Sequence, residues 1–150
     1  MSSPILFWRV CLIGIFALLP VIGSSYAETV DSDVVVITSP SIGEHTIARS
    51  TLRAMFGMRL SKWSDGTPVR VFVMKDDSVE HASFSKNILQ VFPHQLRLSW
   101  DRQVFSGQGQ YPEQVASMQD MISRIASTPG AVGYVKANEV TNNVRILQIR

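Results

Sequence analysis

The sequence holds one cysteine, Cys11, in 150 residues. A lone cysteine cannot form an intrachain disulfide, and it excludes structural zinc sites that need several thiolates. Charged residues are also sparse, at 17%, and 14 basic and 12 acidic side chains leave a net charge of +2. That charge is too small to favour a nucleic-acid partner, which usually meets a concentrated basic patch. Because hydrophobic residues make up 45% of the chain, the composition favours a folded domain.

The common catalytic patterns are missing as well. The sequence has no H-E-x-x-H, no histidine pair with metal-ligand spacing, and no G-x-S-x-G turn around a nucleophilic serine. Glu80 and His81 are adjacent, but adjacent residues on a helix point apart, which gives little support for acid–base catalysis. Gly107 and Gly109 form a lone G-x-G without the strand and third glycine of a dinucleotide site. We therefore expect no enzyme activity, no cofactor and no bound metal.

The first 27 residues have the three parts of a secretory signal peptide. Residues 1–9 carry one positive charge, residues 10–23 are apolar without a break, and small residues precede a cut after Ala27. A membrane anchor is the alternative, but this apolar run contains Pro20 and is short for a span of about 20 residues. We expect cleavage after Ala27, one domain over residues 28–150, a periplasmic or secreted location, and no membrane span after cleavage.

Strand and helix patterns alternate along the rest of the chain. Val34–Ile37 is a β-branched run that is apolar on both faces, as is typical of a buried strand. The expected strands are 34–37, 69–74, 131–135 and 144–149, and the expected helices are 46–60, 80–92, 94–104 and 112–126. This alternation predicts an α/β fold with a mostly parallel sheet of about four strands and helices on its faces.

The first expected helix carries two further predictions. Ser50 and Thr51 are candidate caps for its start. Phe56 and Trp63 are seven residues apart on the same apolar side, and we expect both to pack against the sheet.

In a parallel sheet, ligands bind at the carboxyl ends of the strands, where loops meet helix N-termini. The loops expected at that edge are residues 38–41 and 75–78. Small hydroxyl side chains there can donate to an oxyanion, although the same residue types also cap helices. The candidate ligand-binding residues are Ser39, Ser41 and Ser78, with Lys75 as a source of positive charge.

Three stretches of the sequence resemble the periplasmic phosphate-binding proteins of ABC importers. Residues 52–66 (LRAMFGMRLSKWSDG) resemble their helix–tryptophan–turn segment, and residues 71–78 (VFVMKDDS) resemble their strand and phosphate loop. Residues 128–135 (TPGAVGYV) resemble a late strand. The order and spacing match across roughly residues 34–140, which corresponds to one lobe of those two-lobed proteins. The resemblance implies a three-layer α/β lobe of the periplasmic-binding-protein (PBP) type.

The phosphate loop departs from the family pattern, in which an arginine precedes Ser-Gly-Thr. Ser78 aligns with the serine, whereas Val79 and Glu80 occupy the glycine and threonine positions. Met74 stands at the arginine position, with Lys75 beside it. A carboxylate repels an anion, and the loss of the arginine removes a bidentate partner for phosphate.

The resemblance implies a substrate-binding protein for transport, which binds a small oxyanion such as phosphate weakly or with the help of a partner. The partner in that case is an ABC permease. The substitutions in the phosphate loop favour an alternative: a lobe that has lost its ligand and serves as a protein–protein interaction module in the cell envelope.

Overall fold

The computed structural model describes residues 33–150, so the expected signal peptide and its cleavage site lie outside the described residues. Between residues 33 and 150, no helix combines the length and the apolar character needed to cross a bilayer.

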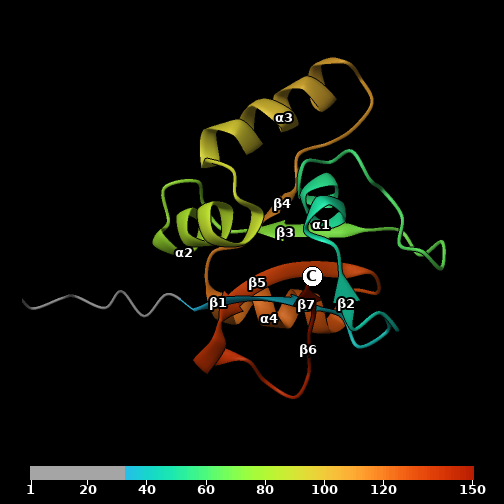
Figure 1. Cartoon of the computed structure of the whole chain (residues 1–150), viewed down its shortest axis with the longest axis vertical. Coiled ribbons are helices and arrows are strands. Elements are labelled where there is room, and N and C mark those ends of the chain that lie inside the picture. The colour runs from blue at the N-terminus through green and yellow to red at the C-terminus, as the bar shows by residue number, and fades with distance from the viewer. Residues whose placement is uncertain (1–32) are drawn as a thin grey trace, which may run out of the picture. The chain divides into compact units, whose positions relative to one another are not determined.

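The described chain is built on a five-stranded mixed sheet with the strand order β4-β3-β5-β1-β6 (Figure 1). Its strands are β1 (Val34–Thr38), β3 (Arg70–Val73), β4 (Glu113–Gln114), β5 (Ala131–Lys136) and β6 (Arg145–Ile146). The pairs β3–β5 and β3–β4 are parallel, whereas β1 is antiparallel to both β5 and β6. Four strands therefore point the same way, and β1 runs against them. The predicted α/β class is confirmed.

The edges of the sheet differ most from the expected strands. The segment expected as a strand over 144–149 is divided between β6 and β7 (Gln148–Ile149). Leu147 separates them because it is buried and donates its N–H to the Val36 oxygen at 2.9 Å. Strand β7 pairs in parallel with β2 (Thr46–Ile47), which lies in a segment expected to be helical.

The helices are α1 (Arg49–Phe56), α2 (Val79–Ser83), the π-helix η1 (Phe84–Leu89), α3 (Pro93–Phe105), α4 (Met118–Ser127) and the 3-10 turn η2 (Ala137–Glu139). The expected caps of α1 were wrong, because its N-cap is Ala48. The expected helix over 112–126 begins at Met118, where the Ser117 hydroxyl accepts from the Asp120 N–H at 3.1 Å. The residues before it form β4, which pairs with β3 as an edge strand.

Helices cover both faces of the sheet, which gives the three layers. On one face, a Cβ at Gly133 would lie 2.6 Å from both Ile125 Cδ1 and Met121 Sδ, so α4 packs directly against β5. On the other face, the next residue along β5, Tyr134, stacks on Phe84 of η1 with ring centroids 4.0 Å apart. This alternation follows from the two-residue period of a strand.

The two aromatic residues expected in the core are buried. Phe56 lies beside the stacked pair of Phe84 and Tyr134, with ring centroids 4.6 and 6.2 Å away. The Trp63 indole donates to the Gly130 oxygen at 2.9 Å, which ties the segment after α1 to the start of β5. Helix α3 packs on the end of α1, because the Trp100 indole donates to the Phe56 oxygen at 2.6 Å.

Candidate functional site

The four predicted ligand-binding residues lie at opposite ends of the strands. We call each border of the sheet formed by strand ends an edge. Because β1 is antiparallel to β5, the loop after β1 adjoins the start of β5, where the Ser39 N–H donates to the Ala131 oxygen at 3.0 Å. Because β3 is parallel to β5, the loop after β3 adjoins the far end of β5. The expectation that both loops share one edge was wrong, since it depended on β1 and β3 pointing the same way. One small anion cannot contact both groups.

Ser39 and Ser41 close the turn after β1. Ser39 is buried, and its hydroxyl lies 2.9 Å from that of Ser41. The Ser41 hydroxyl also accepts from the Gly130 N–H at 3.4 Å. These contacts hold the turn against the start of β5, a role that serves the fold without a ligand.

Ser78 and Lys75 lie at the other edge, in the loop between β3 and α2. The Ser78 hydroxyl caps α2 by accepting from the His81 N–H at 3.1 Å. This bond uses a lone pair of the oxygen and leaves the hydroxyl proton available for an acceptor. The Ser78 N–H donates to the Lys75 oxygen at 3.0 Å, and the Lys75 side chain is exposed.

Met74, which stands where the family pattern has an arginine, is part of the core. Met74 is buried, and its N–H donates to the Tyr134 hydroxyl at 2.8 Å. The same hydroxyl lies 2.7 Å from His81 Nδ1, and His81 is fully buried. Burial lowers the pKa of His81, and to a smaller extent the Asp76 charge raises it and the Arg97 charge lowers it. Burial raises the pKa of Tyr134. The pair is therefore neutral near pH 7.

A second cation reaches this edge from another element, and the sequence analysis missed it. Arg97 of α3 binds the carboxylate of Asp76, two residues before Ser78, with Nε and a terminal nitrogen 2.8 and 2.6 Å from Oδ2. The guanidinium carbon lies 4.9 Å from the Trp100 ring centroid and 5.6 Å from that of Tyr111. Arg97 and Trp100 share a helix face at i, i+3 spacing, which was the available signal.

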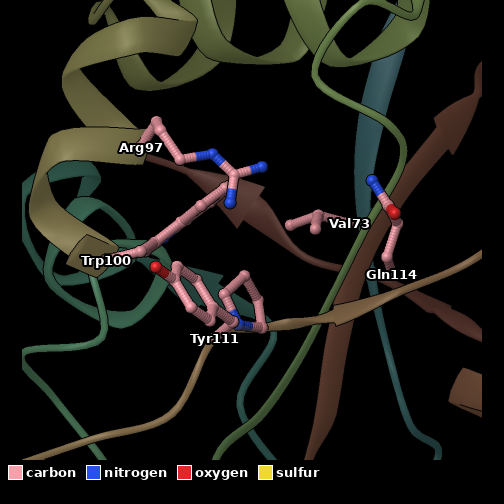
Figure 2. Close-up of a pocket in the computed structure, with 6 residues that line it drawn as sticks. Val73, Arg97, Trp100, Tyr111 and Gln114 are labelled. Carbon is pink, nitrogen blue, oxygen red and sulfur yellow. The ribbon is translucent and has the colours of Figure 1, made fainter. Parts of the chain in front are cut away.

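A cavity of about 130 Å³ opens beside Arg97 (Figure 2). Figure 2 shows the guanidinium extending from α3 into the space between Trp100 and Tyr111 on one side and Val73 and Gln114 on the other. A space of this volume has room for several water molecules or for one small anion. It lies at the ends of β3 and β4, the same edge as the loop that contains Ser78.

Charge at this edge is mixed. Glu80 is partly offset by Lys136, whose Nζ lies 3.3 Å from Oε1. Asp76 is held by Arg97, and Asp77 is exposed. In the part of the chain that the structure describes, no group of three or more His, Cys, Asp or Glu side chains could hold a metal ion. The arrangement thus combines the cations Arg97, Lys75 and Lys136 with three carboxylates and the hydroxyl donor of Ser78.

Comparison with solved structures shows the same fold in phosphate-transport proteins. The chain is similar to a Vibrio cholerae ABC-type phosphate transport receptor (TM-score 0.61, 13% identity), covering 78% of this chain and 46% of that one. A phosphate ABC transporter substrate-binding protein from Clostridium perfringens, solved with bound phosphate, gives a TM-score of 0.63 at 13% identity, with coverages of 78% and 44%. PstS from Borrelia burgdorferi gives 0.61 at 18% identity, with coverages of 79% and 47%.

The chain thus spans under half the length of each of these structures. No curated protein sequence matches it. A family model described as the PBP superfamily domain matches residues 25–146, which is most of the chain. The chain therefore belongs to the PBP superfamily.

Proposed function

We propose that this protein binds a small oxyanion of the phosphate type at the edge of the sheet formed by the ends of β3 and β5. The observation that supports the proposal is the ion pair between Arg97 and Asp76, which lies two residues before Ser78. A carboxylate is itself an oxyanion, and in this structure the Asp76 carboxylate binds the Arg97 guanidinium. A free anion competes with Asp76 for Arg97 and gains the Ser78 hydroxyl.

Three groups contribute to binding in this proposal. Arg97 supplies a planar charged donor that suits tetrahedral oxyanions, and its stacking on Trp100 restricts its position. Ser78 supplies its hydroxyl proton, and the first N–H groups of α2 have no acceptor within the helix. Exposed Lys75 adds charge. Ser39 and Ser41 take no part, because they lie at the opposite edge.

Binding by this edge alone is weak. The side chains of Arg97 and Asp76 are 41% and 36% exposed, so water screens their charges. We expect a dissociation constant no tighter than about 1 mM, equivalent to about 4 kcal/mol, unless a partner covers the site. The proposed setting is the periplasm, after cleavage behind Ala27, with an ABC permease as the partner that receives the anion.

Calorimetric titration with phosphate and with sulfate tests the proposal. Asp76→Asn should tighten phosphate binding, because it removes the carboxylate that competes for Arg97. An exposed ion pair is worth up to about 1 kcal/mol, so the expected gain is about twofold to fivefold. Ser78→Ala should weaken binding.

Asp77→Asn is the matched control, since it removes the same charge one residue away without a contact to Arg97. Its effect should be smaller than that of Asp76→Asn. If both variants bind phosphate as wild type does, or if no variant binds it up to 50 times the expected constant of about 1 mM, the proposal fails.

The interaction module remains the second candidate function. The observation that favours it is exposed apolar surface along α3: the side chains of Phe92, Leu98 and Phe105 are 55%, 50% and 84% exposed. Only Leu96 and Trp100 of this helix are buried among its described residues. Large apolar side chains that gather on one element are typical of a binding surface.

A further inference from the structure

Two cavities lie beside α3, and both include Val91 in their lining. None of the proposed anion-binding residues lines either cavity. One, of about 280 Å³, is lined by Lys86, Gln90, Val91 and Phe92. The other, of about 80 Å³, lies between α1 and α3 and includes Arg53 and Arg59 in its lining. We call the two cavities together the basic groove.

The charge of the basic groove is one-sided. Among the described residues that line it, Arg53, Arg59 and Lys86 are cationic and none is acidic. None of these three forms an ion pair with another residue in the range 33–150. The whole chain has a net charge of only +2, so the concentration of positive charge at this place is a local feature.

The apolar part of the groove lies next to these charges. Phe92 lines the larger cavity and is 55% exposed, and Val91 lines both cavities. The groove therefore offers apolar contacts bordered by cations. An occupant with apolar side chains flanked by carboxylates complements it, whereas a basic occupant is repelled.

The backbone of the groove wall is unusual. η1 is a π-helix, a form that occurs frequently at functional sites, and it ends at Gln90 with φ of 56°. A non-glycine residue at positive φ is strained, and such strain persists where the surroundings hold it. The Arg53 Nε donates to the Leu89 oxygen at 3.0 Å and so fixes this end of η1 against α1. The wall is thus preformed.

We infer that the basic groove binds an acidic, apolar-containing peptide segment of a partner protein. This inference rests on the second candidate function and names the chemistry of its partner. It does not depend on Arg97 or Ser78, which lie outside the residues that line the groove.

Fluorescence anisotropy with a labelled peptide tests the inference. The probe is the nonapeptide Gly-Glu-Glu-Leu-Glu-Phe-Glu-Glu-Gly, and the comparison peptide has Gln in place of every Glu. We expect the acidic peptide to bind wild type at least about tenfold more tightly than the Gln peptide. The double variant Arg59→Glu/Lys86→Glu should lose at least about tenfold of that affinity.

Lys62→Glu is the control, because Lys62 is exposed and does not line the groove. It should change the affinity less than about twofold. An equal loss in Lys62→Glu means that the peptide responds to overall charge, and this result overturns the inference. Arg53 is left unchanged because it supports the end of η1.

Other occupants give different results. Binding to vesicles of phosphatidylcholine with phosphatidylglycerol, without peptide binding, assigns the groove to a lipid surface. A dimer in ultracentrifugation that the double variant dissociates assigns it to a second copy. Either result overturns the acidic-peptide inference but keeps an interaction function, whereas binding to none of these probes contradicts both.

Discussion

His81 and Tyr134 show how one buried pair connects three elements. The Tyr134 hydroxyl of β5 accepts from the Met74 N–H after β3, and it lies 2.7 Å from His81 Nδ1 of α2. All three groups are satisfied when Tyr134 donates to Nδ1 and the ring proton is on Nε2. In the described structure Nε2 is buried and has no hydrogen-bond partner. A second proton would go to Nδ1, where it would remove the acceptor of the Tyr134 hydroxyl and leave a charged ring in a buried place.

The stability of the protein should therefore fall in mild acid. Burial in the folded state lowers the pKa of His81 from its ordinary value of 6.5. Below pH 6.5 the unfolded chain therefore binds a proton at His81 more readily than the folded chain does, and this favours unfolding. The His81 contribution is full above pH about 6.5 and is lost as the pH falls toward the folded-state pKa, at up to about 1.4 kcal/mol per pH unit. Urea unfolding at pH 7.5, 6.5 and 5.5 measures this.

Two histidine variants separate this effect from other titrations. His81→Asn should be less stable than wild type at pH 7.5 but should lose less stability on acidification. His94→Asn, at an exposed position, should keep the wild-type pH dependence. A His81→Asn variant with the same acid sensitivity as wild type contradicts the assignment.

At the scale of elements, the sequence predicted buried strands better than helix ends. The strand β1 was expected because its β-branched run is apolar on both faces, and β3 because its segment is rich in valine and partly alternating. Both properties depend on the local sequence. The start of α1 was missed because Thr46–Ile47 is taken into a pairing with β7, about a hundred residues later. The π-helix was missed because its apolar spacing resembles that of an α-helix. The pairing of β2 with β7 shows that a long-range contact can override local propensity.

The turn before β5 gives a prediction at the element scale. Gly130 has φ of 76°, and a Cβ there would lie 2.1 Å from the Pro68 oxygen, a backbone atom. Gly130→Ala should therefore lower the free energy of unfolding by at least about 1–3 kcal/mol, as judged by urea unfolding. Gly43→Ala is the control, because a Cβ at Gly43 meets nothing within 4 Å. A loss within about 0.5 kcal/mol for Gly130→Ala is the contrary result.

At the scale of the whole molecule, the direction of β1 decides which residues can act together. The sequence predicted the family of the chain and a loop after β3 that contains Ser78, but it could not show that β1 runs against β5. The direction of a strand relative to its neighbours depends on how the whole chain folds into the sheet, and no local sequence pattern encodes it. This is why Ser39 and Ser41 were grouped with Ser78, and why Arg97, supplied by a distant helix, was not.

Export of the protein is a prediction at the scale of the whole molecule. The charged start, the apolar run and the small residues before Ala27 predict cleavage at that point. Mass spectrometry of the protein from a periplasmic fraction should find Glu28 as its first residue. An uncleaved chain that fractionates with membranes would show instead that the apolar run is an anchor.

The central claim is that an oxyanion binds at the edge that carries Ser78 and Arg97. The most direct measurement is a phosphate titration followed by 1H–15N correlation NMR. We expect saturable shifts for the backbone amides of Ser78 to Glu80 and for the Arg97 Nε–H, larger in Asp76→Asn, with the amides of Ser39 to Ser41 unchanged. Shifts confined to Ser39 to Ser41, or none at any residue up to 50 mM phosphate, about 50 times the expected constant, would contradict it.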